Sequence, residues 1–501
     1  MSLWVAVLMA AWSALTSFAG AATRRDALVV SGERALFAAL AFVALAAAGV
    51  WGALLTSDFS LRYVASYTSL NLPLLYKFAA LWAGPAGQWL FLALLLSACA
   101  GVMLIASRTR RARAPWAAGT TAVALLGLLI LASLVSNPFE RLPLTPPEGR
   151  SLNPLLQAGL MAIQPPSVYI GLVASVIPFA FAVGAIATKQ FDEEWVRSVR
   201  PWVLISWVFL SIGIVLGMRW AYLEPAWSAT WRRDSVQNAS LFPWIAQSAV
   251  LYSIRAYERG ATLRKWNAIV IVASFVLALF AALVTRTGLS QSFEMLAQSG
   301  AGAWLFGVGA AVVSISAWLV TTRLTDVSPR PGVQTVARDW RRYGVYGACA
   351  GMALVIAALV GSAFRQQHAT SLNAGQSFTT RDPWGSEWVF TSQGISMDHL
   401  RNREMQIVAL KPARNGAAMP MIRSENREYV DAFDRVTFDA TIKPGVLQTP
   451  LQDVYMVFVG ATPDGKAVVR IAFNPLVAWC WWGGMIVVLG GLVAMWPEVR
   501  A

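Results

Sequence analysis

Long apolar runs separated by short polar connections make up most of the chain. Runs of about 18 or more residues are long enough to cross a bilayer as α-helices. Eleven such runs predict membrane-spanning helices near residues 3–20, 35–55, 87–107, 117–137, 167–187, 201–219, 241–257, 267–285, 302–320, 343–364 and 475–496. The pattern predicts an all-α polytopic membrane protein of about eleven transmembrane helices, with one large hydrophilic insert before the last.

The insert, residues 365–473, has the short alternating runs that are typical of β-strands. Val454–Val459 and Ala467–Phe473 flank the turn sequence Pro463-Asp464-Gly465-Lys466, which favours a β-hairpin. The sequence therefore predicts three parts: a helical membrane domain at 1–364, a β-rich domain at 365–473, and a final helix with a short tail at 474–501.

Basic residues gather in alternate connections between the predicted helices. The clusters follow the first, third, fifth, seventh and ninth helices and comprise Arg24, Arg25, Arg34, Arg108, Arg110, Arg111, Arg113, Lys189, Arg197, Arg200, Arg255, Arg259, Arg264, Lys265, Arg323, Arg330, Arg338, Arg341 and Arg342. Because loops rich in Lys and Arg stay in the cytoplasm, we expect a periplasmic N-terminus, a periplasmic insert and a cytoplasmic C-terminus in a bacterial inner membrane. The first twenty residues lack a basic segment, which indicates a retained helix rather than a cleaved signal peptide.

The composition agrees with a membrane protein and narrows the chemistry. Hydrophobic residues make up 57% of the chain, charged residues 13%, and the mean hydropathy is +0.54. The net charge of +14 is explained by the basic loops, so it does not indicate nucleic acid. Cys99, Cys349 and Cys480 lie in apolar runs without a CxxC or CxxCH motif, so neither a thiol relay nor covalent haem attachment to this chain is indicated.

An aromatic stretch at residues 220–244 lies on the predicted outer side, between two apolar runs. Its tryptophans are Trp220, Trp227, Trp231 and Trp244, and its other notable residues are Tyr222, Glu224, Asp234 and Asn238. Indole and phenol rings combine a large apolar face with one hydrogen-bonding group, so a cluster of them can cover a porphyrin plane. An aromatic belt at the membrane interface has the same composition, and composition alone leaves both interpretations open.

The order of residues in this stretch resembles the tryptophan-rich WWD signature of the cytochrome c maturation haem lyases, the CcmF/NrfE family. The matching residues are Trp220, Ala221, Tyr222, Glu224, Trp227, Trp231, Asp234, Val236, Asn238, Ala239, Ser240, Leu241, Pro243 and Trp244. Arg233, Ser235 and Gln237 depart from the signature. The segments at 58–87, 152–171 and 453–497 are also similar to this family, but about four of its helices are missing before residue 341.

In the family that the stretch resembles, four histidines bind haem iron. This chain has none of the four. Its two histidines, His368 and His399, both lie in the insert, and the family's ligand positions are occupied by Gln164, Tyr252, Glu294 and Cys349. Tyrosinate and thiolate bind haem iron in other proteins, but apolar surroundings keep both groups protonated. We therefore assign no metal ligand, and we expect Tyr252 and Cys349 to be packing residues.

The resemblance implies a shortened, histidine-depleted member of the family. Such a protein would hold haem transiently at the outer face for attachment to apocytochrome c, with Trp220, Tyr222, Trp227, Trp231, Asp234, Asn238 and Trp244 as the candidate haem-contacting residues. The missing histidines leave lyase activity open. The alternative is a non-catalytic, haem-free scaffold for a haem-bearing maturation subunit. A small-molecule transporter is disfavoured, because no charged residue lies deep within a predicted helix.

Overall fold

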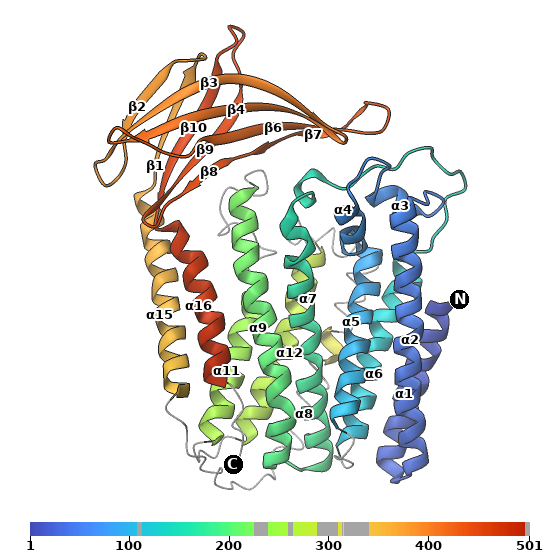
Figure 1. The fold of residues 1–501 in the computed structure, drawn as a ribbon. Helices are drawn as coiled ribbons and strands as arrows, with labels where there is room; N and C mark the ends of the chain where they lie inside the picture. Colours follow the sequence, from blue (N-terminus) through green and yellow to red (C-terminus); the bar gives the residue numbers. More distant parts are fainter. Residues whose placement is uncertain are drawn as a thin grey trace.

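The computed structural model describes residues 1–107, 113–224, 239–258, 264–287, 309–312, 314 and 340–495. The described helices form an upright bundle, and one end of the bundle is covered by a β domain (Figure 1). The helices are α1 (Ser2–Thr23), α2 (Asp26–Thr56), α3 (Arg62–Tyr67), α4 (Leu74–Ala79), α5 (Pro85–Ala106), α6 (Ala114–Ile130), α7 (Gln164–Ala174), α8 (Val176–Thr188), α9 (Glu193–Leu223), α11 (Leu241–Glu258), α12 (Arg264–Thr287), α15 (Trp340–Gly361) and α16 (Val477–Met495).

Eight helices in the described part of the chain are long and apolar enough to cross a membrane. They are α1, α2, α5, α6 with its extension to Val135, α7 and α8 together, α9, α15 and α16. This arrangement confirms the predicted polytopic helical membrane protein. The two predicted helices after the aromatic stretch are α11 and α12, and α12 carries a shorter apolar segment, Trp266–Ala281. The predicted helix at 302–320 lies outside the described residues except for 309–312 and 314.

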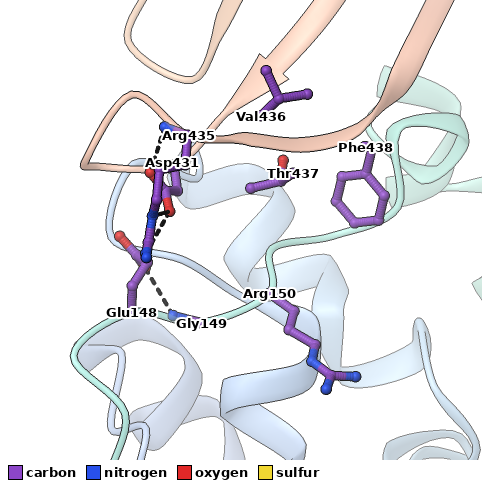
Figure 2. A pocket seen from close by; sticks show the side chains of 8 residues that line it. All are labelled: Glu148, Gly149, Arg150, Asp431, Arg435, Val436, Thr437 and Phe438. Carbon is purple, nitrogen blue, oxygen red and sulfur yellow. Dashed lines mark hydrogen bonds and ion pairs between the residues drawn. The ribbon is translucent and has the colours of Figure 1, made fainter.

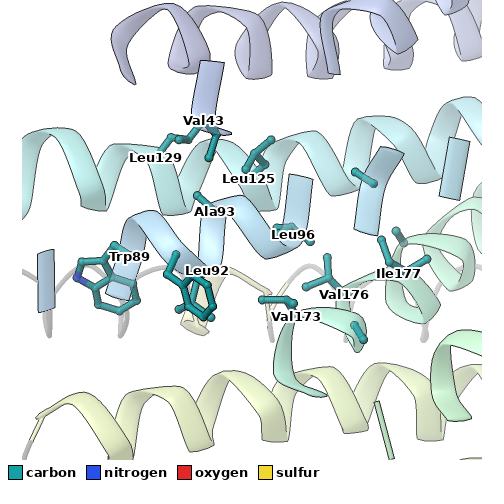
Figure 3. Close-up of a cluster of buried hydrophobic side chains, with 14 of the residues drawn as sticks. Val43, Trp89, Leu92, Ala93, Leu96, Leu125, Leu129, Val173, Val176 and Ile177 are labelled. Atoms are coloured by element: carbon teal, nitrogen blue, oxygen red, sulfur yellow. The ribbon is translucent and has the colours of Figure 1, made fainter. Parts of the chain in front are cut away.

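Apolar side chains from α5 to α8 fill the interior of the bundle (Figure 3). Trp89 and Leu96 of α5 are 2% and 0% exposed, and Leu125 and Leu129 of α6 and Ile177 of α8 are fully buried. Removing such surfaces from water is worth about 25 cal/mol per Å² in a soluble protein, whereas in a bilayer close packing supplies the stability. Because α7 and α8 both contact α9, this core fixes the helix that leads into the aromatic stretch.

Glycines bring α15 and α16 into direct backbone contact. A Cβ on Gly351 would lie 2.6 Å from the carbonyl oxygen of Gly483, and a Cβ on Gly483 would lie 2.5 Å from that of Gly351. Gly344 and Gly490 form a similar contact, at 2.7 Å in each direction. Only residues without side chains allow helices to approach this closely.

Ten strands between α15 and α16 form two antiparallel sheets. The first sheet has the order β1-β10-β9-β8 and the second contains β2-β3-β4-β6-β7, with β5 pairing with β4. The strands are β1 (Gln366–Leu372), β2 (Ser377–Arg381), β3 (Glu387–Leu400), β4 (Arg403–Arg414), β5 (Ala417–Ala418), β6 (Ile422–Val430), β7 (Val436–Lys443), β8 (Gly445–Gln448), β9 (Gln452–Ala461) and β10 (Ala467–Pro475). The predicted β-rich insert before the last helix is confirmed.

The predicted hairpin is formed by β9 and β10, which pair antiparallel with Val454 opposite Phe473. The core between the sheets contains Trp388, Phe390, Phe458 and Phe473, each 0% exposed. The chain enters this domain from α15 and returns to the membrane through α16 (Figure 1). The β domain is therefore connected to the membrane domain at both of its ends, through α15 and α16.

Candidate functional site at the junction of α9 and the β domain

The last turn of α9 carries the first residues of the aromatic stretch to the β domain. α9 is capped by Asp192, the residue before its first turn, whose side chain accepts a hydrogen bond from the Trp195 amide at 2.9 Å. It ends at Leu223, and Glu224 leaves the helix with φ −123°. Trp220 and Tyr222 therefore lie on a rigid element, and residues 225–238, which follow, lie outside the described part.

Tyr222 is the centre of a hydrogen-bond network with the first sheet. Its hydroxyl donates to Asp453 Oδ2 at 3.2 Å and accepts from Asn474 Nδ2 at 3.1 Å. Its backbone carbonyl accepts from the Tyr455 hydroxyl at 3.2 Å, and the rings of Tyr222 and Tyr455 lie 5.1 Å apart. The aromatic stretch is thereby attached to β9 and β10.

An ion pair makes a second connection two residues further along. Lys443 Nζ, at the end of β7, lies 3.3 Å from Glu224 Oε1. Burial raises the pKa of the Glu224 carboxyl, and the positive charge of Lys443 offsets only part of this effect. Glu224 is 6% exposed, so the pair is partly shielded from solvent and fixes where the stretch leaves the membrane domain.

Arg219 packs beneath this network. Its guanidinium lies 5.9 Å from the Tyr222 ring centre and 5.3 Å from that of Trp481 on α16, both within the range of cation–π attraction. With the Gln448 amide oxygen turned towards the guanidinium, the two terminal nitrogens donate to it at 2.6 and 2.8 Å. Burial raises the pKa of the nearby Asp453 carboxyl to about 6, although the Tyr222 hydrogen bond and the charge of Arg219 act in the opposite direction.

We expect Asp453→Asn to stabilise the chain at pH 7.5 but not at pH 4. The folded-state pKa of about 6 lies above the ordinary value of 3.8. The stability linked to this proton is therefore fully present below about pH 4 and is lost as the pH rises through about 6. This pKa shift corresponds to a change of about 3 kcal/mol at most in the free energy of unfolding. Thermal denaturation of the detergent-purified chain at both pH values measures the change in stability, with Asp464→Asn in the exposed β9–β10 turn as control. An equal gain in stability at both pH values would contradict the prediction.

The described tryptophans of the stretch are packed into the bundle. Trp220 is 2% exposed and belongs to the main hydrophobic core. Trp244 of α11 donates through Nε1 to Ser211 Oγ at 2.7 Å and stacks on Trp207, with ring centres 6.1 Å apart. Together with Tyr222, these rings anchor both ends of the stretch. Trp227, Trp231, Asp234 and Asn238 lie outside the described residues, so the proposed haem-binding surface stays a prediction.

The substituted ligand positions that the structure describes do not converge on one site. Gln164, at the start of α7, is 5% exposed and donates through Nε2 to the Gly213 carbonyl at 3.3 Å. Tyr252 is 75% exposed, so the expectation that its ring packs inside the bundle is wrong. Cys349 is also exposed, because the glycines on either side of it face α16. Glu294 lies outside the described residues.

A haem held within the membrane domain by Tyr252 and Cys349 does not fit this arrangement. Both side chains point out of the bundle, where a lipid tail rather than a cofactor would meet them. His368 lies in β1 and His399 in β3. The described residues also contain no group of three or more His, Cys, Asp or Glu side chains that could hold a metal ion. The described side chains therefore supply no ligand pair for a resident haem.

A second contact joins the far side of the β domain to the outer loops of the membrane domain. Asn402 Nδ2 donates to Gln157 Oε1 at 2.9 Å in a buried contact, and Arg401 Nε donates to Asn71 Oδ1 at 3.2 Å. The β domain is therefore held at two separated places on the bundle.

Sequence reasoning missed the partners of Tyr222. Asp453, Asn474 and Lys443 were not singled out, although Asp453 and Asn474 lie in the segment that resembles the family's C-terminal part. One signal was present: Asp453 is an acid in a largely apolar strand, and it is 0% exposed. A buried acid in such a strand requires a polar partner from another element.

These features define a polytopic membrane protein with a β domain docked on the helix that precedes an aromatic connection. Residues 84–290 match the family model described as Cytochrome C assembly protein. The match covers about two fifths of the chain, and the chain is similar over longer ranges to proteins of the CcmF type.

Several curated relatives and one solved structure are similar to this chain. The cytochrome c-type biogenesis protein CcmF of Pseudomonas aeruginosa is 35% identical over 306 residues, covering 60% of this chain and 46% of that protein. CcmF of Escherichia coli is 36% identical over 286 residues, covering 56% and 43%. NrfE of Haemophilus influenzae is 38% identical over 249 residues, covering 48% and 38%.

A solved structure titled Cytochrome c Heme Lyase CcmF has the same fold. It aligns with a TM-score of 0.74 over 99% of this chain and 97% of that one, at 20% identity. In the sequence alignments, this chain spans less than half the length of the curated relatives named above.

Proposed function

We propose that this chain is a cytochrome c biogenesis protein of the bacterial inner membrane that holds haem at the periplasmic surface for attachment to apocytochrome c. The observation that carries the proposal is the attachment of Tyr222, a residue of the WWD-like stretch, to Asp453 and Asn474 of the β domain. This contact joins two of the segments that resemble the family, and the fold that holds them is shared with a cytochrome c haem lyase.

The orientation follows from the distribution of charge. The connections between α1 and α2 and between α8 and α9 carry basic residues such as Arg24, Arg25 and Lys189, and they lie at the end of the bundle opposite the β domain (Figure 1). By the positive-inside rule this end is cytoplasmic. The β domain and the N-terminus are then periplasmic, and the C-terminus is cytoplasmic.

In this proposal the described residues fix both ends of the haem-handling stretch. Trp220 and Tyr222 hold its beginning against the bundle and the β domain, and Trp244 holds its end against α9. Haem is the cargo, and Trp227, Trp231, Asp234 and Asn238 would contact it. Holding a flat substrate in one orientation while two thiols approach it is a large part of such a reaction.

A second candidate function, a haem-free scaffold for a haem-bearing maturation subunit, has one observation in its favour. Tyr252 and Cys349 face outwards and Gln164 is bonded to the backbone of α9. None of these three replaces a histidine ligand. A scaffold would keep the docked β domain and the aromatic stretch as contact surfaces for the subunit that carries the haem.

Absorption spectra of the detergent-purified chain with added haem distinguish the two functions. We expect a Soret band that decreases at least fivefold in Trp231→Ala and is unchanged in Trp4→Ala, a control on the outer face of α1 that is 49% exposed. Tyr252→Phe with Cys349→Ala should leave the spectrum unchanged. A chain that binds no haem, but is recovered together with a haem-bearing membrane subunit, would establish the scaffold instead.

A further inference from the structure

A cleft between the beginning of β7 and an outer loop of the membrane domain is lined by acidic groups that already have partners (Figure 2). The Asp431 carboxylate lies 2.8 Å from two nitrogens of Arg435. Glu148 Oε2 accepts a hydrogen bond from the Ala432 amide at 3.4 Å, which joins the loop to the β6–β7 turn. These contacts explain this cleft as part of the attachment of the β domain.

A second cleft, of about 680 Å³, lies where the β domain meets α9, α15 and α16. α16 packs against both α9 and α15, and the connection from β8 to β9 lines the end of the cleft nearest the β domain. α15 and α16 lie at one edge of the bundle (Figure 1), and Trp482 and Met485 of α16 are 61% and 54% exposed. The cleft therefore opens towards the lipid that would surround the bundle.

Arg219, near the end of α9, brings one positive charge to this cleft. Its guanidinium has five N–H groups, and the Gln448 amide oxygen, turned towards it, accepts from two of them at 2.6 and 2.8 Å. Among the described residues, no carboxylate forms an ion pair with Arg219. The nearby Asp453 carboxylate accepts from the Tyr222 hydroxyl instead. Arg219 can therefore donate further hydrogen bonds to an anion.

The guanidinium of Arg219 is held in one position. It lies 5.3 Å from the ring centre of Trp481 and 5.9 Å from that of Tyr222, and the residue is half-buried. An arginine that only extends to the membrane surface keeps its charged end in water, whereas a fixed group has less freedom to lose when a ligand binds. The wall beside it is also fixed, because Trp479 Nε1 donates to the Pro450 carbonyl at 2.8 Å.

The cleft changes from polar to apolar along the bundle axis. Val215 lies four residues before Arg219 on α9, and Met485 lies four residues after Trp481 on α16, so each is about 6 Å further along its helix. Because α9 ends at the β domain and α16 begins there, both displacements run away from the β domain. Leu354 of α15 completes the apolar part. The order from charge to apolar wall is that of a phosphate and an acyl chain in one leaflet.

We propose that this cleft binds an anionic phospholipid in the leaflet on the side of the β domain. The phosphate accepts hydrogen bonds from Arg219, and one acyl chain lies along the apolar part of the cleft. Guanidinium groups bind phosphate through paired, charge-assisted hydrogen bonds, and basic pockets between membrane helices bind anionic headgroups. A free phosphate would leave the apolar wall uncovered. This inference goes beyond the proposed function and does not depend on haem binding.

Native mass spectrometry of the full chain in detergent, titrated with dioleoyl phosphatidylglycerol, tests the site. We expect Arg219→Gln to weaken binding at least tenfold and Arg219→Lys, which keeps the charge without the paired donors, two- to fourfold. The matched control is Arg365→Gln, an exposed arginine between α15 and β1 that does not line the cleft. It should change the affinity less than twofold. Equal affinities of the parent chain and Arg219→Gln would overturn the proposal.

Three further ligands identify the occupant on the unsubstituted chain. Dioleoyl phosphatidylethanolamine has the same chains without net charge and should bind at least fivefold more weakly. Inorganic phosphate and glycerol phosphate, at tenfold excess, should not displace phosphatidylglycerol. Equal affinity for the two lipids would overturn the assignment to an anionic lipid. Displacement by inorganic phosphate would show a site for a free anion and would overturn the role of the acyl chain.

Discussion

Replacing Gly351 with leucine is expected to abolish accumulation of the folded chain in the membrane. A side chain at this position would meet the Gly483 carbonyl oxygen at 2.6 Å and the Val487 amide nitrogen at 2.7 Å, and neither backbone atom can move aside. The helices would have to separate over their whole contact, which removes the packing that joins α15 to α16. Membrane fractionation and size-exclusion chromatography in detergent measure the outcome.

The matched control is Gly347→Ala on the same helix. Its added Cβ would lie 3.7 Å from the Gly490 Cα, an ordinary van der Waals contact, so this variant should accumulate like the parent chain. Normal yield and a single chromatographic peak for Gly351→Leu would show that the glycine contact between the two helices is not required for folding.

Tyr222→Ala is expected to lower the free energy of unfolding by about 4 kcal/mol, the usual range for removing a large buried ring. The substitution deletes the ring that packs against Tyr455 and Trp481 and leaves Asp453 without its hydroxyl donor. Tyr222→Phe keeps the ring and should cost about 2 kcal/mol, the penalty for a buried acceptor that loses its partner. Denaturation in detergent measures both.

A double-mutant cycle separates the hydrogen bond from a general loss of packing. In an Asp453→Asn background the cost of Tyr222→Phe should fall by at least half, because the orphaned group no longer carries a charge. The control is Tyr343→Phe on α15, where the side chain is 70% exposed. This substitution should leave the free energy of unfolding unchanged. If the cost of Tyr222→Phe is the same with and without Asp453→Asn, the carboxylate is not the reason for the loss.

Much of the architecture could be predicted from periodicity. Apolar runs located the helices, and alternation around the turn at Pro463–Lys466 located the β9–β10 hairpin, because both patterns are local and strong. The glycines on either side of Cys349 face α16 and explain the close contact of the two helices.

The site was less predictable, because its contacts are distant in sequence. Tyr222 and Asp453 are separated by 231 positions, and no local pattern shows that they meet. Tyr222 was predicted to contact haem, and the structure places it in the domain contact. The outward position of Tyr252 could not be predicted either. In a membrane helix, the side that faces lipid and the side that faces other helices are both apolar, so the hydrophobic pattern does not distinguish them.

The two attachments of the β domain bear on how the hairpin of α15 and α16 is held to the rest of the protein. α15 and α16 contact the rest of the bundle mainly through α9. The β domain between them also contacts the outer loops of the membrane domain, where Asn402 donates a hydrogen bond to Gln157. The hairpin of α15 and α16 is thus tethered both inside the bundle and through its outer domain, and disrupting one attachment alone would leave the other to keep it beside the remaining helices.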